Sequence, residues 1–101
     1  MKIKLIKKSD TKAELLLEGR MDTNAAPDAQ EAFLKVAEKY NDIIINFSDL
    51  AFISSAGLRA ILVLQKHANR VGINITYTHI KPSVREVFEL TGFSGILNIE
   101  D

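Results

Sequence analysis

The 101-residue sequence contains no cysteine, which excludes disulfide bonds, thiol catalysis and thiolate metal sites. It also has no excess charge of either sign, because 13 lysine and arginine residues balance 13 aspartate and glutamate residues. A chain without a net field does not gather nucleic acid or an anionic membrane surface, so any partner has to be recognised by shape. The lack of cysteine agrees with a reducing compartment, and we expect a cytoplasmic protein.

Long apolar segments are also missing. The longest uninterrupted apolar run, Ala60 to Leu64, is far shorter than the roughly 20 residues that a membrane-spanning helix needs. The first eight residues are basic but lack the apolar centre of a signal peptide. The sequence therefore predicts neither export nor membrane insertion.

The motifs of common enzyme sites do not occur either. There is no glycine-rich phosphate loop with its lysine, and no glycine stands two places before Ser54 or Ser55, as a nucleophile elbow would require. His67 lies twelve residues beyond Ser55 in one expected helix, or roughly 18 Å along its axis, too far to act as a base for that serine. His67 and His79 form no recognisable zinc pattern. We therefore predict no catalytic residues, no metal site and no cofactor.

Alternating strand and helix patterns run through the chain. Hydrophobic residues make up 47% of it and charged residues 26%, as in a folded domain with a packed core. Apolar residues alternate with period two in some segments and recur at three and four residues in others. Strands are expected near residues 2–5, 13–17, 43–47, 73–77 and 96–99, and helices from Pro27 to Tyr40, from Ser55 to about Arg70, and from Pro82 to Gly92.

This order of elements predicts an α/β fold in one domain spanning residues 1–101, since so short a chain cannot bury a second core. We expect a mixed sheet of about five strands with helices mainly covering one side. The nearly continuous apolar run at 43–47 is typical of a central strand buried on both faces. Ser48 and Asp49 are expected to end that strand; Asp49 either supports the serine site or only ends the strand, and the second reading is favoured. The loop after Gly19 offers Asp22, Thr23 and Asn24 as caps for the first helix.

The serine pair Ser54-Ser55 stands at the start of the second expected helix. The first N–H groups of a helix lack partners, and that end carries a partial positive charge, so a serine can cap it and a phosphoryl group is held there even better. Phosphorylation would add about −1.5 to −2 charges, which the helix start tolerates but an opposing partner surface does not. The small residues Ala56 and Gly57 would let a kinase or partner approach closely. The alternative is that the serines only cap the helix and Gly57 only permits tight packing.

The segment Phe52-Ile53-Ser54-Ser55-Ala56-Gly57-Leu58-Arg59 resembles the signature of the STAS domain family, the anti-sigma factor antagonists. Members of that family carry a phosphorylatable serine at the start of a helix after the third strand. Residues 19–22 resemble the glycine and aspartate that precede the family's first helix, and residues 82–93 resemble its closing helix. The three blocks occur in the family's order, and the similarity covers essentially the whole chain.

The resemblance implies roles for individual residues. Ser55 matches the phosphorylated serine, and Ser54, a possible alternative acceptor, stands where the best-known members have aspartate. Arg59 stands where many members have glycine. Asp22 matches a position near the binding surface, although an aspartate before a helix can also be only a cap. The implied partner-binding surface consists of Asp22, Ser54, Ser55, Ala56, Gly57, Leu58 and Arg59.

The function implied by the resemblance is that of an anti-sigma factor antagonist that regulates transcription by partner switching. The unphosphorylated form would bind an anti-sigma factor serine kinase and free a sigma factor. Phosphorylation on Ser55 would release the kinase, and a serine phosphatase would reset the switch. The alternative is a STAS adaptor subunit of a larger signalling or transport assembly without obligatory phosphorylation, which Ser54 in place of aspartate favours.

Overall fold

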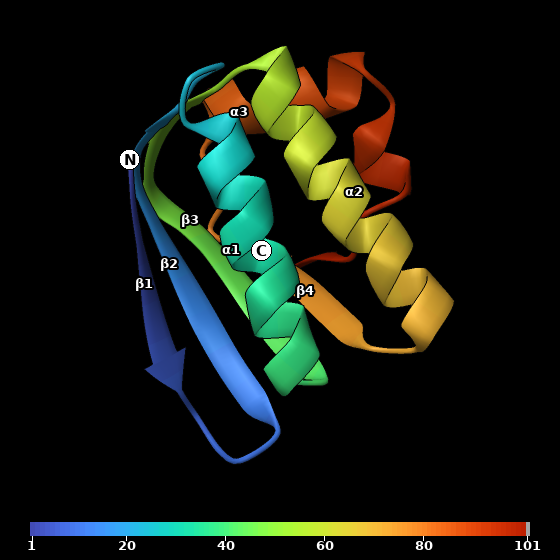
Figure 1. Cartoon of the computed structure of the whole chain (residues 1–101). Helices are drawn as coiled ribbons and strands as arrows, with labels where there is room; N and C mark the ends of the chain where they lie inside the picture. The colour runs from blue at the N-terminus through green and yellow to red at the C-terminus, as the bar shows by residue number, and fades with distance from the viewer. Residues whose placement is uncertain (101) are drawn as a thin grey trace.

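The computed structural model describes residues 1–100 of the chain. Strands and helices alternate along it in the expected order (Figure 1). A short 3-10 turn, η1 (Phe93–Gly95), precedes the last strand. The other elements are β1 (Lys2–Lys7), β2 (Lys12–Met21), α1 (Ala26–Lys39), β3 (Asp42–Ile53), α2 (Ser55–Val71), β4 (Asn74–Thr78), α3 (Pro82–Leu90) and β5 (Ile99–Glu100).

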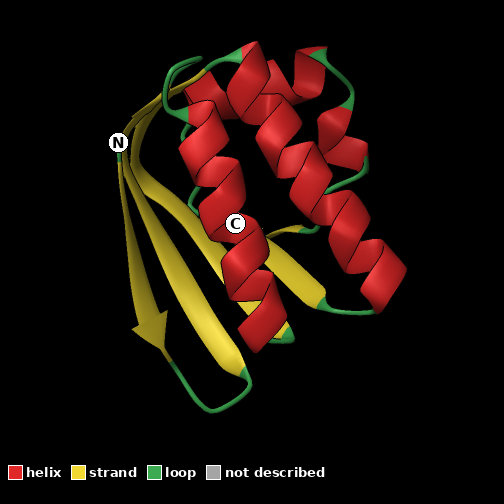
Figure 2. Ribbon diagram, in the orientation of Figure 1, coloured by secondary structure: helices red, strands yellow, loops and turns green. Residues whose placement is uncertain are grey.

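The five strands form one mixed sheet in the order β1-β2-β3-β4-β5. Strand β1 is antiparallel to β2, and the remaining neighbours are parallel. The helices lie on one side of this sheet (Figure 2), which confirms the predicted α/β architecture. Because β2 and β3 run in the same direction, they end at the same edge, and α1 and α2 both begin there (Figure 1).

Strand β3 differs from the prediction in two ways. It is not buried on both faces, because Ile43, Ile45 and Phe47 face the helices while Ile44 and Asn46 are only half-buried on the open face. It also does not end at Ser48-Asp49 but continues to Ile53. Pairing with β2 resumes after an irregularity, with Glu18 opposite Asp49, so the neighbouring strand supplies the hydrogen bonds that local sequence did not predict.

Two further boundaries differ from the prediction. Strand β2 extends to Met21, so Gly19 and Arg20, expected in a loop, continue the strand opposite Leu50 and Phe52. The last strand was expected at 96–99, but η1 occupies the approach to it and only Ile99–Glu100 pairs with β4. The longer β2 arises from pairing between distant segments, which overrides local turn propensity, whereas the shorter last strand arises from local turn bonds, because the N–H groups of Ile96 and Leu97 donate to the carbonyl oxygen of Phe93.

The core fixes α2 and α3 to the middle of the sheet. The Phe47 ring packs edge-on against Tyr77, with 6.3 Å between ring centroids, and against Phe88, with 5.8 Å. The buried Tyr77 hydroxyl donates a hydrogen bond of 2.9 Å to the side-chain oxygen of Gln65 on α2. Burial raises the pKa of Tyr77 well above its ordinary value, so this donor keeps its proton. Helix α3 is thus held by an aromatic contact, and helix α2 by a buried hydrogen bond.

Candidate functional site at the start of helix α2

Ser54 caps helix α2 with its side chain. Its Oγ accepts a hydrogen bond of 3.1 Å from the main-chain N–H of Gly57, and its own N–H donates to the main-chain carbonyl oxygen of Met21 at 2.9 Å. The residue has extended backbone angles, as an N-cap does, and is half-buried. The hydroxyl of Ser54 is therefore already engaged in holding the helix start and its link to β2.

Ser55 is the first residue of α2 and is exposed. Within residues 1–100 its hydroxyl has no hydrogen-bond partner. The first turn of α2 contains no acidic residue, so the partial positive charge of the helix start is not offset there. The two serines consequently differ in what they can do, because Ser54 is engaged as a cap and Ser55 presents a free hydroxyl to the solvent.

Gly57 and Leu58 lie on the inner side of the helix. A Cβ atom on Gly57 would come within 2.8 Å of the Cγ1 of Ile53 and 2.9 Å of the main-chain oxygen of Met21. Leu58 is only 3% exposed and belongs to the core. Both residues pack the helix start against the ends of β2 and β3. The outer surface of this turn is formed by Ser55, Ala56 and Arg59.

Ala56 and Arg59 lie on the outer side of α2 and border a shallow groove. The groove has a volume of about 350 Å³ and lies between the starts of the two helices that pack against each other, α1 and α2. Arg59 is exposed and forms no ion pair with any residue in the described part of the chain. The other residues that line the groove are uncharged and come from the β2–α1 loop and α1: Thr23, Ala26, Pro27 and Gln30.

Asp22 shapes the loop that leads into α1. Its Oδ1 accepts a hydrogen bond of 2.9 Å from the N–H of Ala25, and its main-chain oxygen accepts one of 3.0 Å from the N–H of Ala26. Ala25 is the N-cap residue of α1 and makes no side-chain cap, so Asp22 satisfies the N–H group just before the helix. This fixes the loop that carries Thr23 to the groove, whatever further contact Asp22 makes.

A cation–π contact near the serines was missed from the sequence. The Arg20 guanidinium carbon lies 4.2 Å from the centre of the Phe52 ring, and both side chains are exposed. The two residues are paired across β2 and β3, immediately before the pair formed by Met21 and Ile53 that supports Ser54. Only the strand register brings Arg20 and Phe52 together, and no local motif signals it.

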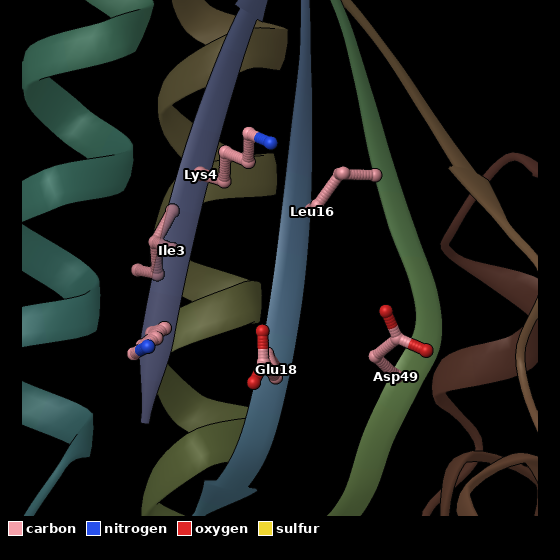
Figure 3. Close-up of a pocket in the computed structure, with 6 residues that line it drawn as sticks. Ile3, Lys4, Leu16, Glu18 and Asp49 are labelled. Carbon is pink, nitrogen blue, oxygen red and sulfur yellow. The ribbon is translucent and has the colours of Figure 1, made fainter.

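The open face of the sheet contains a larger hollow of about 560 Å³, away from the helices (Figure 3). Asp49 lies here on β3, beside Glu18 on β2 and Lys4 on β1. The prediction that Asp49 ends a strand was wrong, because it lies within β3 and is exposed. With Lys2 at its rim, two lysines face two carboxylates, so the hollow has no net charge to select a ligand of either sign.

The histidines do not join the serines in any catalytic arrangement seen in residues 1–100. The Nδ1 of His67 lies 3.1 Å from the guanidinium of Arg70, one turn further along α2, and His79 is exposed after β4. No group of three or more histidine, aspartate or glutamate side chains in this part of the chain is placed to hold a metal ion. In the same residues, no helix is both long and apolar enough to cross a membrane.

The sequence of this chain also matches a known family over almost its whole length. Residues 4–101 match the STAS domain. The chain therefore belongs to the STAS domain family. This agrees with the resemblance found in its serine segment.

Individual relatives and solved structures show how far the similarity extends. BtrV of Bordetella bronchiseptica, a proposed anti-sigma factor antagonist, is 34% identical over 76 residues, which are 75% of this chain and 66% of that protein. The unphosphorylated form of SpoIIAA, an anti-sigma factor antagonist of Bacillus, has the same fold, with a TM-score of 0.81 at 20% identity over 99% of this chain and 89% of SpoIIAA. The murine anion transporter Slc26a9 contains a similar fold, with a TM-score of 0.75 and 13% identity over 92% of this chain but only 16% of the transporter.

Proposed function

We propose that this protein is an anti-sigma factor antagonist that acts in the cytoplasm by partner switching. In its unmodified form it binds an anti-sigma factor serine kinase, and a sigma factor is freed. BtrV and SpoIIAA, which share its sequence or fold, support this role. The observation that carries the proposal is the free, exposed hydroxyl of Ser55 at a helix start whose backbone is already capped by Ser54.

Phosphorylation of Ser55 then releases the kinase. The Ser55 oxygen bonds to the γ-phosphorus of a nucleoside triphosphate, the bond from that phosphorus to the β,γ-bridging oxygen breaks, and the hydroxyl proton passes to a base of the kinase. The phosphoryl group adds negative charge beside the groove while the helix start tolerates it, so the domain stays folded and its partner leaves. A serine phosphatase restores the hydroxyl.

The contact surface that we propose is narrower than the seven residues implied by the sequence. Ser55, Ala56 and Arg59 present the outer side of α2, and the β2–α1 loop, held by Asp22, forms the opposite wall of the groove. Ser54, Gly57 and Leu58 position this surface from behind. A flat helix side with a small-residue groove suits a protein partner better than a small molecule.

Binding to the serine kinase of the host tests the proposal. Ser55→Asp places a carboxylate where the phosphoryl group would be, and we expect at least about a tenfold loss of affinity, because an added negative charge would have to be desolvated in the interface. Ser83→Asp is the matched control, since Ser83 is also an exposed serine in the first turn of a helix. Isothermal titration calorimetry of the three chains measures the difference, and equal affinities would contradict the proposal.

A second function is favoured by one specific observation. The neutral Ser54 stands where the best-known antagonists have aspartate, and the fold also occurs within the larger anion transporter. A STAS adaptor of this kind would hold a larger assembly together without any modification of Ser55. Such an adaptor would bind its partner equally well before and after Ser55→Asp.

A further inference from the structure

We propose that Arg59 is the internal partner of a phosphoryl group on Ser55, so that phosphorylation withdraws Arg59 from the groove where a partner's carboxylate would bind. This inference rests on the proposed function, because it assumes that Ser55 is the modified residue. It adds a second effect to the negative charge itself, namely the loss of the groove's positive charge.

The first observation in support of the pairing is the spacing of Ser55 and Arg59 on α2. Ser55 and Arg59 are four residues apart, so they lie on one side of the helix, with Cβ atoms about 5 to 6 Å apart. Both are exposed. Long side chains on a helix lean back toward its N-terminus, so the turn that contains Ser55 is within reach of the guanidinium of Arg59.

The second step is that Arg59 lacks the acidic partner that Lys35 on α1 has. On α1, Glu31 stands four residues before Lys35, and the two form an ion pair of 3.1 Å. On α2, Ser55 takes the place of that glutamate four residues before Arg59. Arg59 makes no ion pair within residues 1–100, and the first turn of α2 has no acidic residue. A phosphoryl group on Ser55 would therefore complete a pair of the kind that α1 already has.

The third step concerns the groove. Arg59 is its only charged lining residue, beside the small or neutral side chains of Ala26, Gln30 and Ala56. In the unmodified chain its guanidinium is available to a carboxylate of a protein partner, and a charge pair of this kind sets partner choice and association rate. Once it pairs with the phosphoryl group, the groove presents no net attraction to that carboxylate.

Phosphorus NMR tests the pairing without any kinase. Phosphoserine is introduced at position 55 by genetic encoding, and the second pKa of the phosphoryl group is measured in chains with Arg59 and with Arg59→Gln. We expect this pKa to be lower by about 0.2 to 0.4 unit when Arg59 is present, because the cation favours the dianion. The difference should shrink at 1 M salt.

The matched control is Lys66→Gln, which removes an exposed cation from the same helix about two turns further on. It should leave the phosphoryl pKa unchanged, and Arg59→Lys should keep part of the shift. Equal pKa values with Arg59 and with Arg59→Gln at low salt would overturn the proposed pairing.

Kinase binding tests the consequence for the partner. Arg59→Gln should weaken binding of the unmodified chain by about fivefold but binding of the phosphorylated chain by less than about twofold, since Arg59 is already withdrawn there. Equal losses in both forms would overturn the withdrawal. A phosphoryl pKa that depends on Arg59, in a chain that no host kinase modifies, would uphold the pairing and contradict the proposed function, so the two failures are distinguishable.

Discussion

Helices α2 and α3 both begin with an exposed serine in their first turn, Ser55 and Ser83, yet the two helix starts are built differently. At α2 the Ser54 side chain caps the helix, and Gly57 lets the first turn lie against the strands. At α3 the N-cap residue is Lys81, whose side chain makes no cap. The start of α2 therefore has a side-chain cap as well as a close contact with the strands, whereas the start of α3 has no side-chain cap.

The surroundings of the two serines differ as well. Arg59 follows Ser55 by four residues, whereas the apolar Val87 follows Ser83 by four. No cation follows Ser83 at three or four residues, the spacings at which side chains on a helix meet. An exposed serine at the start is thus common to α2 and α3. The start of α2 differs because Ser54 and Gly57 fix its backbone and Arg59 supplies a positive charge.

The largest effect on stability is expected from Gly57→Ala. A Cβ there would come within 2.8 Å of Ile53 and 2.9 Å of Met21, so the start of α2 has to shift away from the strands. We expect a loss of about 1 to 3 kcal/mol in the free energy of unfolding, despite the better helix propensity of alanine. Urea unfolding followed by circular dichroism measures it.

The matched control is Gly95→Ala, because a Cβ on Gly95 would meet nothing within 4 Å and this glycine has no positive φ. Its effect should be within about 0.5 kcal/mol. If Gly57→Ala lowers the free energy of unfolding no more than Gly95→Ala does, α2 does not pack as closely against the strands as the structure shows.

Substitutions at the N-cap residues of α2 and α3 should change the free energy of unfolding by less than Gly57→Ala does. Ser54→Ala removes the acceptor for the Gly57 N–H and should cost about 1 kcal/mol, whereas Lys81→Ala removes no cap and should cost almost nothing. Ser54→Asp should keep the stability, because a carboxylate caps a helix and also suits its dipole. Thermal unfolding of the three variants measures these differences in stability. Equal losses for Ser54→Ala and Lys81→Ala would contradict the proposed difference between the two helix starts.

The smallest effect on stability is expected from a substitution of Glu14, which lies on the open face of the sheet. This variant shows whether a small loss of stability alone changes kinase binding. Glu14 on the open face accepts a hydrogen bond of 3.1 Å from Asn46 and pairs with Lys8 at 3.2 Å. The bond from Asn46 and the charge of Lys8 lower the pKa of Glu14 below its ordinary value of 4.5. A lowered pKa in the folded state stabilises the fold above the unfolded pKa, and this contribution is lost as the pH falls through the folded value.

Glu14→Gln should therefore cost about 0.5 kcal/mol at pH 7 and progressively less below pH 4.5. Urea unfolding at several pH values measures the difference. Kinase binding should not change, since both helix starts are intact. A loss of binding in Glu14→Gln would mean that small changes in stability, rather than the site, govern the binding results.

Much of the fold followed from periodicity in the sequence. The order of elements, the one-sided helix layer and the approximate boundaries of α2 were predicted from apolar spacing and the serine pair, and in the structure the helix ends at Gly72, which adopts a φ of 83°. The family was also recognisable, because its serine segment is contiguous in the chain. Contiguous patterns of this kind need no knowledge of tertiary contacts.

The errors arose where distant segments pair. The extension of β3 past Ser48-Asp49 depends on its register with β2, and so does the contact between Arg20 and Phe52. The difference between Ser54 and Ser55 was also hidden, because only the backbone path shows which hydroxyl turns back to the Gly57 N–H. The inward position of Gly57 likewise depends on how α2 meets the strands.

The most direct test of the central claim is to map phosphate on the intact chain. The protein is incubated with host-cell extract and a nucleoside triphosphate, and the modified residues are identified by mass spectrometry, with Ser55→Ala as the control. We predict phosphate on Ser55 and none on Ser54 or Ser83, because only Ser55 combines a free hydroxyl, a fixed helix start and a cation four residues on. Phosphate on Ser54 or Ser83 instead, or on none of the three, would contradict the account.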